Sequence, residues 1–464
     1  YELTIKPYML LNVEPDYYDG MVRIHFNCLA NTNTLTLHMK SIEVNSSSLL
    51  LTSSTDTAIG GEHRAFNWTE DTVRTFFVAE FKTTSGDAAS SFFKAGNNYT
   101  IEMRFKGFLR NDNTGFYRSF YRDASNVTKY LIASHMEPLN ARKAFPCFDE
   151  PSFKAKFRLT VIHDKSLTPT SNMPVKRSVA IESVGAEYDW QETEFDETVT
   201  MSSYLVALIV SDFKCKKAVA HPPLSKNVTI DVCGRTTAFD QLDYALDIAT
   251  RAIEELEKYF NYIYPLPKSD QYGVPTFNAG AMENWGLIIY IETALFKSPA
   301  TSRASEQSIV RIVVHELVHQ WFGNLVTAKW WDDTFLNEGF ARFFDYHLTE
   351  FVKPEWEQRK LYVEFALNLI NQFSNENTRA ISNIVNTPAE VSAQFDSAVT
   401  YGKVRSSIQL SLNKIRFIVH CFKTTTKRVP SCFACLTIWL ARRRSREVFR
   451  YFFSSCFQIT FFFF

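Results

Sequence analysis

The chain contains 464 residues, of which 45% are apolar and 22% are charged. This length predicts two or three domains with large cores, and the composition excludes a disordered, collagenous or disulfide-dense scaffold. The 50 basic residues balance 50 acidic ones, so net charge gives no reason to expect binding to nucleic acid or to an anionic membrane. No run of eighteen apolar residues occurs, and we expect no transmembrane helix within this sequence. Because residue 1 is Tyr, we expect the natural N-terminus, with any signal peptide or anchor, to lie outside it.

Alternating apolar and polar residues predict β-strands throughout residues 1–211. Val22 and Ile24 alternate with Arg23 and other polar neighbours, and a period of two is typical of half-buried strands. The apolar runs at 157–162 and 204–210 predict two further strands. We therefore expect an N-terminal β domain.

The hydrophobic period changes to three and four residues after this domain. The spacing of Leu242, Leu246, Ala249, Ile253, Leu256 and Phe260 predicts an amphipathic helix. A Pro- and Gly-rich loop is expected over 265–280, and residues 306–322 are apolar on every side, which predicts a buried helix. We place a domain boundary near residue 212, followed by a mostly helical domain over 212–403.

Residues 404–464 differ in composition from everything before them. They hold 11 Lys and Arg against the single acid Glu447, contain no Gly or Asp, and end in four Phe. The organisation of the chain therefore changes near residue 403.

Cysteines and glycosylation sequons bear on the compartment. The cysteines of the first 403 residues are too sparse to predict a disulfide framework, and they are Cys28, Cys147, Cys215 and Cys233. Asn-X-Ser/Thr sequons in the first half favour a lumenal or extracellular domain, and they begin at Asn45, Asn67, Asn98, Asn126 and Asn227.

The predicted buried helix carries a metal-ligand spacing. His315 and His319 lie four residues apart and therefore on one helix face, where both imidazoles can bind one zinc ion. Glu316 is rotated by about 100° and can address water at that metal. The alternative is two core histidines with ordinary hydrogen bonds, and the spacing favours zinc.

A catalytic zinc site needs a third protein ligand and an open fourth position. Glu338 follows His319 by nineteen residues, at the start of another predicted helix. A helix, a turn and a returning helix would bring this carboxylate to the two imidazoles. Asp345 lies on the same face as Glu338, either as a hydrogen-bond acceptor for a ligand imidazole or as a solvated acid.

The segment GAMEN at 280–284 is a second candidate site. Small residues such as Gly280 and Ala281 allow a peptide backbone to approach, and the carboxylate of Glu283 can hold a cationic amine. From chemistry alone a structural turn remains the alternative.

Several motifs together resemble the aminopeptidase N family of zinc exopeptidases. The sequences GAMENWG and HELVHQWFGN are followed by a Trp pair and by NEGFA, and four shorter motifs precede them. In chain order the motifs occupy residues 115–119, 141–151, 171–174, 201–205, 280–286, 315–324, 330–331 and 337–341. The resemblance implies an α+β multidomain fold, in which an N-terminal antiparallel β-sandwich or saddle precedes a thermolysin-like, mostly helical zinc peptidase domain. That domain would be incomplete at its C-terminus here.

The resemblance also implies roles for individual residues. His315, His319 and Glu338 would hold one zinc ion, and Glu316 would take a proton from the attacking water and pass it to the leaving amine. Glu283, assisted by Glu137, would bind the α-ammonium group of the substrate. Gly280, Ala281 and Met282 would form the substrate-binding segment, and Tyr401 would donate a hydrogen bond to the oxyanion. His135 stands where the family usually has Gln, and a second cation there would weaken amine binding.

The resemblance ends after Lys403. We expect residues 404–464 to be a translated intron or a misjoined gene model, and the alternative is a genuine basic tail that binds membrane or packs as core. Without the helices that close the family's catalytic domain, the site would be open to water, and the zinc ligands could persist while turnover does not.

The sequence thus predicts a zinc aminopeptidase acting on peptides with a free N-terminus. We expect it outside the cell, at the cell surface as a type II membrane ectodomain or in a secretory lumen rather than in the cytoplasm, with membrane contact only through an anchor absent from this chain and with no nucleic-acid partner. An inactive peptide-binding protein and an endopeptidase of the thermolysin kind are the alternatives.

Overall fold

The computed structural model describes residues 1–55, 62–82, 91–182, 188–358, 382–395 and 400. Two predictions concern residues outside the described part of the chain. They are the catalytic role of Tyr401 and the departure of residues 404–464 from the family.

The N-terminal half is built of strands. Their bounds are β1 (Glu2–Pro7), β2 (Tyr17–Asn27), β3 (Thr34–His38), β4 (Ile42–Ser53), β5 (Asn67–Asp71), β6 (Phe76–Glu80), β7 (Asn98–Phe108), β8 (Gly115–Arg122), β9 (Thr128–His135), β10 (Arg158–Asp164), β11 (Thr168–Ser171), β12 (Val175–Ala180), β13 (Trp190–Phe195) and β14 (Leu208–Ser211). Short 3-10 turns occur at Ala141–Lys143 and Ser203–Leu205.

The second half combines a smaller sheet with helices. Its strands are β15 (Lys214–Ala220), β16 (Val228–Gly234), β17 (Asp270–Val274), β18 (Ala281–Met282) and β19 (Leu287–Ile291). Its helices are α1 (Asp243–Phe260), α2 (Glu292–Leu295), α3 (Arg303–His319), α4 (Phe335–Val352) and α6 (Pro388–Ser392), with 3-10 turns at Thr236–Gln241, Trp331–Asp333, Pro354–Trp356 and Ala393–Phe395. None of the helices in the described part of the chain is long and apolar enough to cross a membrane.

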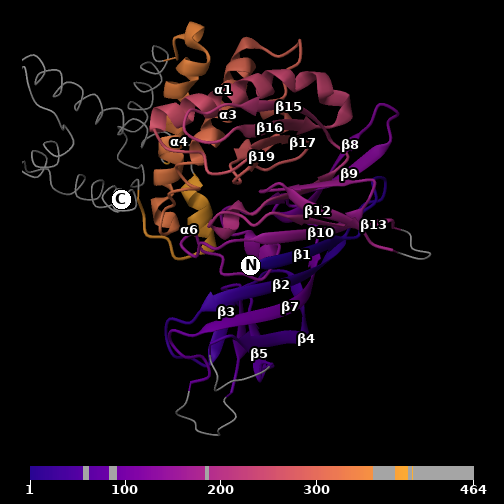
Figure 1. Ribbon diagram of the computed structural model, residues 1–464, viewed down its shortest axis with the longest axis vertical. Coiled ribbons are helices and arrows are strands. Elements are labelled where there is room, and N and C mark those ends of the chain that lie inside the picture. The colour runs from indigo at the N-terminus through magenta and orange to yellow at the C-terminus, as the bar shows by residue number, and fades with distance from the viewer. Residues whose placement is uncertain (56–61, 83–90, 183–187, 359–381, 396–399, 401–464) are drawn as a thin grey trace, which may run out of the picture.

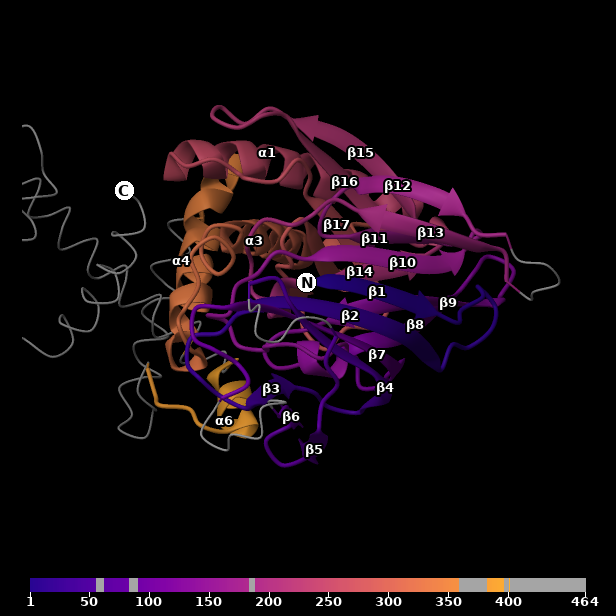
Figure 2. The same cartoon turned by 60° about the horizontal axis from the view of Figure 1, so that its bottom comes forward.

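The strands form four sheets. The N-terminal half holds a seven-stranded sheet in the order β12-β13-β10-β1-β2-β7-β4, a four-stranded sheet β11-β14-β9-β8 and a three-stranded sheet β3-β6-β5. Figure 2 shows the strands of the largest sheet side by side. Their pairing is antiparallel, as the family resemblance implies, except that β1 and β10 run parallel. This exception is possible because more than a hundred residues of chain connect the two strands.

The second half has a mixed five-stranded sheet in the order β15-β16-β17-β19-β18. Helices α1, α3 and α4 pack against one another, and α1 also contacts β15 and β16 (Figure 1). No sheet of the described residues contains strands from both sides of residue 212. The boundary near this residue remains a prediction that the sheet topology favours.

Burial explains why the clearest elements form where the sequence predicts them. In β2, Val22 and Ile24 are buried while their neighbours point outward, as a period of two requires. In α1, the buried positions follow the three- and four-residue spacing, so one face of the helix covers the core. Ser302 begins α3 by accepting a hydrogen bond from the backbone N–H of Ser305.

Two local predictions were wrong. The run 204–210 is a 3-10 turn followed by β14, which begins only at Leu208, although every residue of the run is buried. A continuous apolar run has no period from which to distinguish a turn from a strand. The predicted loop 265–280 contains β17, whose residues are all buried, including the polar Asp270 and Gln271. A strand covered on both faces can carry polar residues only where they have partners, and those partners were not visible in the sequence.

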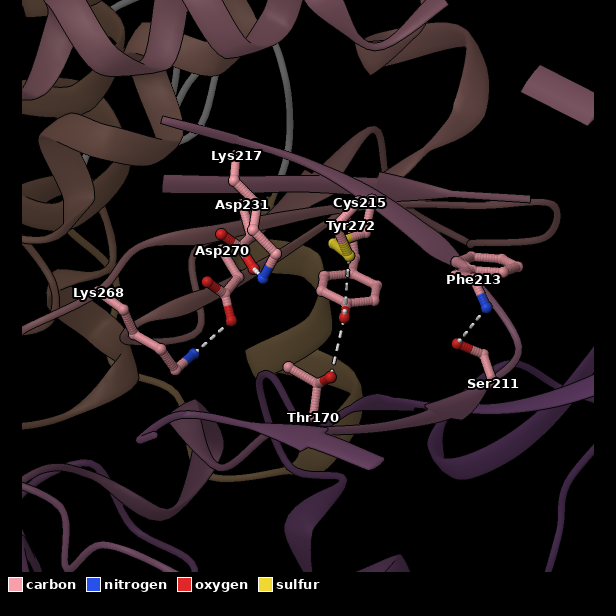
Figure 3. The surroundings of a disulfide bond; sticks show 10 residues. Thr170, Ser211, Phe213, Cys215, Lys217, Asp231, Lys268, Asp270 and Tyr272 are labelled. Carbon is pink, nitrogen blue, oxygen red and sulfur yellow. Dashed lines mark hydrogen bonds and ion pairs between the residues drawn. A yellow bond between two sulfur atoms is a disulfide. The ribbon is translucent and has the colours of Figure 1, made fainter. Parts of the chain in front are cut away.

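The sequence predicted no disulfide framework, and the structure contains one disulfide among its described residues. Cys215 and Cys233 are register partners on β15 and β16, and their sulfur atoms are bonded (Figure 3). The hydroxyl of Tyr272 lies 3.8 Å from the Cys215 sulfur and 2.8 Å from the hydroxyl of Thr170 on β11. This disulfide connects the edge strand β15 to its neighbour beside the contact between the two halves.

Candidate metal centre and amine site

The two histidines of helix α3 bring one ring nitrogen each close together. His315 Nε2 and His319 Nε2 lie 3.1 Å apart, because residues four apart in a helix lie one above the other. The Oε2 atom of Glu338 lies 3.4 Å from each of these nitrogens. Among the described residues, these three form the only group of His, Cys, Asp or Glu whose ligand atoms lie within 4.8 Å of one another.

The dimensions of this triangle fit a tetrahedral zinc ion. Zinc bonds of about 2.0–2.1 Å place tetrahedral ligand atoms roughly 3.3–3.4 Å apart. The observed separations of 3.1 and 3.4 Å are close to these values. Two imidazoles and one carboxylate are also a usual donor set for a catalytic zinc site, with a fourth position left for water or substrate.

The other ring nitrogens support this orientation. His319 Nδ1 donates to the backbone carbonyl of Phe322 at 2.9 Å, and His315 Nδ1 lies 3.5 Å from the Oδ2 atom of Asp345. These acceptors favour a proton on Nδ1 and leave both Nε2 lone pairs directed at the shared point. Asp345 is fully buried and is paired with Arg342 at 2.8 Å. Of the two readings of Asp345, the solvated acid was wrong and the acceptor beside a ligand imidazole agrees with the structure.

Unpartnered oxygen atoms gather around this centre. One carboxylate oxygen of each of Glu283, Glu316 and Glu338 is buried without a hydrogen-bond partner. Such atoms are uncommon in folded proteins because each costs about 1–3 kcal/mol. Their concentration here indicates a place where cations bind.

The acids of the cluster differ in the direction in which their pKa values are shifted. Burial would raise the pKa of Glu338, but the adjacent His319 and His315 hold it below its ordinary range. Burial raises the pKa of Glu316 to about 8 and also raises the pKa of Glu283. The histidines respond in the opposite sense: burial would lower their pKa values, but the neighbouring carboxylates outweigh it and raise them. The charges of the two imidazoles and of Glu338 therefore stabilise one another.

Glu137, from the N-terminal half, lies close enough to this cluster for the charges of the cluster to shift its pKa. It follows β9, is 8% exposed, and its pKa is raised well above the ordinary range by burial and then by the charge of Glu283. The charge of Glu283 raises the pKa of Glu137, and a positive group beside both acids would stabilise their ionised forms. An ammonium ion between Glu137 and Glu283 would have this effect.

The substrate-binding segment lies at the edge of the smaller sheet. Among the described residues, strand β18 pairs only with β19, which leaves the other edge of Ala281 without a neighbouring strand. Gly280 is exposed, and no described residue lies within 4 Å of the position that its Cβ would occupy. The side chain of Met282 is buried in the core and is 1% exposed.

His135 differs from its predicted state. Its ring lies 4.7 Å from that of Phe277, and Nδ1 lies 3.3 Å from the carbonyl oxygen of Asn113. Burial lowers its pKa to about 4. The expected second cation is therefore absent at neutral pH, and amine binding is not opposed by a charge at this position.

Sequence reasoning missed the residues that hold the amine site in place. Gln320 and Asn324 both donate to the carbonyl oxygen of Glu283. Both belong to the motif at 315–324, but neither could be given a role because their partner lies far away in the sequence.

The fold and this centre define a metallopeptidase domain. A profile described as "Peptidase M1 N-terminal domain" matches residues 1–205, and one described as "Peptidase family M1 domain" matches residues 244–415, which extends past Lys403. The chain is 38% identical to aminopeptidase N of Bos taurus over 420 residues, covering 89% of this chain and 42% of that protein. It is 35% identical to aminopeptidase N of Homo sapiens over 421 residues, 88% of this chain and 42% of the relative, and 34% identical to glutamyl aminopeptidase of Sus scrofa over 413 residues, 88% and 41%.

The chain therefore belongs to the M1 peptidase family, the family of aminopeptidase N. It spans about two fifths of the length of these relatives.

Proposed function

We propose that this chain is the metal-binding part of a zinc-dependent aminopeptidase, which removes the N-terminal residue from peptides. The observation that carries the proposal is the triangle of two imidazole nitrogens and one carboxylate oxygen, 3.1 to 3.4 Å on a side, beside the buried acids Glu316 and Glu283. His315, His319 and Glu338 would hold the zinc ion. When bound there, zinc supplies Lewis acidity toward water and the scissile carbonyl group.

Glu316 would act as general base and then general acid. It neighbours the first ligand on α3, and one of its oxygen atoms has no hydrogen-bond partner. A carboxylate without a competing donor can accept a proton from water and return it to the leaving amine.

Glu283 and Glu137 would select chain ends. Their buried carboxyl groups attract the α-ammonium group of a peptide, while an internal peptide bond offers no cation. The free edge of β18 at Ala281 would hold the peptide backbone extended by hydrogen bonds of the β-ladder kind. Tyr401 remains the proposed donor to the oxyanion.

We also propose a lumenal or extracellular location. The disulfide between Cys215 and Cys233 requires an oxidising compartment. The asparagines of all predicted sequons are exposed and thus accessible to glycosylation: Asn45, Asn67, Asn98, Asn126 and Asn227.

An assay of the zinc-loaded chain on aminoacyl chromogenic substrates tests the catalytic proposal. Glu316→Gln should lower kcat by roughly 10²–10⁴-fold, the usual contribution of a general base, while zinc content stays at that of the parent chain. Glu306→Gln, at the far end of the same helix, is the control and should keep the parent rate. Equal rates for the parent chain and Glu316→Gln would remove the assigned mechanism.

The same assay separates the alternatives. An N-acetylated substrate cut as fast as the free amine would indicate an endopeptidase. Peptide binding with zinc bound and no cleavage would indicate an inactive binding protein.

A further inference from the structure

The amine-binding acid is tied to the metal-binding helix through its backbone. The carbonyl oxygen of Glu283 accepts hydrogen bonds from Asn324 Nδ2 at 2.9 Å and from Gln320 Nε2 at 3.0 Å. Gln320 also donates to the carbonyl of Glu316, one helical turn earlier. The segment 320–325 that leaves α3 therefore determines how far Glu283 stands from the metal ligands.

This exit segment is itself held by the N-terminal half. The hydroxyl group of Tyr204 donates to the carbonyl of Gly323 at 3.0 Å. The ammonium group of Lys154 donates to the carbonyls of Asn324 and Leu325, both at 3.0 Å. Gly323 has φ 130°, a conformation that favours glycine, so these donors hold a backbone shape that few other residues would adopt.

The N-terminal half also holds the turn that follows the acid, between β18 and β19. Asn172 Nδ2 donates to the carbonyl of Trp285, two residues after Glu283, at 3.0 Å. The next residue, Gly286, has φ 85°, and a Cβ there would lie 2.3 Å from the carbonyl oxygen of Asn172. Only glycine permits this close approach of the two backbones.

Asn172 and Tyr204 are rigid parts of the N-terminal half. The side chain of Asn172 is 2% exposed, and it donates to the carbonyl of Leu205 while accepting from the N–H of Ala207. Tyr204 is 1% exposed in the turn Ser203–Leu205 of the N-terminal half, and its ring also packs 5.2 Å from that of Trp331 in the second half. A donor fixed in this way transmits the position of its own domain to the carbonyl that it binds.

We propose that Lys154, Asn172 and Tyr204 form an interdomain brace that sets the position of the amine-binding acid relative to the metal-binding helix. The brace rests on the proposed aminopeptidase function, and its members are positioning residues because they act through the backbone carbonyls of Gly323, Asn324, Leu325 and Trp285. An exopeptidase must hold the α-ammonium group and the scissile bond at one fixed separation, and a misplacement of about 1 Å can cost roughly a hundred-fold in rate. Through the brace, the N-terminal half would contribute to a site whose metal ligands all belong to the second half.

Tyr204→Phe tests the brace most sharply, since it removes one donor and leaves the ring in place. In the zinc-loaded full chain we expect zinc content and the midpoint of unfolding to match the parent, and KM for an aminoacyl chromogenic substrate to rise roughly ten-fold with a smaller change in kcat. The dissociation constant of leucinamide, measured by calorimetry, should rise by a similar factor. Tyr18→Phe is the matched control, because its hydroxyl donates to the carbonyl of Ala144 within the N-terminal half, and it should leave KM and binding unchanged.

Lys154 provides a second test. Lys154→Met should raise KM and weaken leucinamide binding, and Lys154→Arg, which can still donate to both carbonyls, should restore most of each. Parent values of KM and leucinamide affinity in both Tyr204→Phe and Lys154→Met would overturn the brace while leaving the proposed function intact. If the parent chain binds leucinamide but cleaves nothing, the proposed function fails. The ratio of the leucinamide dissociation constants of variant and parent then still tests the brace. A parent chain that neither cleaves nor binds would overturn both.

Discussion

The two halves of the chain treat buried charge in opposite ways. In the N-terminal half, Arg142 and Asp149 form a buried ion pair at 2.8 Å, and Thr75 and Ser203 complete their hydrogen bonds. No buried side-chain nitrogen or oxygen among the described residues 1–211 lacks a hydrogen-bond partner. In the second half, oxygen atoms of Glu283, Glu316 and Glu338 have none.

The pKa values of histidines in the two halves are also shifted in opposite directions. Burial and then the charge of Arg142 lower the pKa of His38 to about 3, whereas carboxylates raise the pKa of the buried His319 well above its ordinary value. His38 is therefore favoured in its neutral form, and His319 is favoured in its charged form among the acids. The contrast shows that matched buried charge, as in Arg142 and Asp149, stabilises the fold, while the unmatched oxygen atoms of Glu283, Glu316 and Glu338 lie at the proposed binding site. Four measurements would sharpen or break this distinction.

The largest effect is expected from breaking the N-terminal ion pair. Asp149→Ala should lower the free energy of unfolding by about 3–5 kcal/mol, because Arg142 would remain buried without its counter-charge. Urea denaturation measures the loss. Glu197→Ala breaks the exposed pair with Arg158 and should cost at most about 1 kcal/mol. Equal costs for the two variants would contradict the comparison.

Zinc should stabilise only through the second half. At about 100 times its dissociation constant, zinc should raise the free energy of unfolding by about 2.7 kcal/mol. His319→Ala should abolish this increment, and His163→Asn, at a buried histidine of the N-terminal half, should retain it. Thermal unfolding with zinc and with a chelator gives the result. An increment that survives in His319→Ala would exclude the site.

Replacing a buried Glu by Gln should change the free energy of unfolding in opposite directions at two positions of the second half. In the zinc-free chain, Glu316→Gln should raise the free energy of unfolding by about 1–2 kcal/mol, because burial opposes the ionisation of Glu316 and raises its pKa to about 8, whereas an amide is neutral without binding a proton. Glu257→Gln should lower it, because that buried carboxylate accepts from the backbone N–H groups of Leu224 and Ser225. Denaturant titration of both variants is sufficient, and a loss of stability in Glu316→Gln would show that its charge is matched.

The smallest effect, counted per pH unit, concerns the pH dependence of the free energy of unfolding. The pKa of His38 falls from 6.5 in the unfolded chain to about 3 in the fold. The unfolded chain therefore binds one more proton between these values, and the free energy of unfolding should decrease as pH falls through this window, by at most about 1.4 kcal/mol per pH unit. His38→Gln should flatten that slope in the zinc-free chain. An unchanged slope would mean that other groups carry the acid sensitivity.

Local patterns in the sequence determined the parts of the site that lie within one element. The four-residue spacing of His315 and His319 places both rings on one helix face whatever surrounds the helix, and the period of α1 follows from its own residues. The GAMEN segment was also recognisable before any contact was known. These features could be predicted because they depend on backbone geometry and short-range order.

Tertiary structure decided what depends on distant partners. The approach of Glu338 is set by the packing of α4 on α3, Glu137 and Tyr204 come from the other half of the chain, and the turn at Ser203–Leu205 has no periodic signal. A buried polar group becomes informative only when its partners, or their absence, are known, since the same residue is stabilising when matched and costly when unmatched. That is why the ligand helix could be predicted from the sequence while the brace that positions the amine site could not.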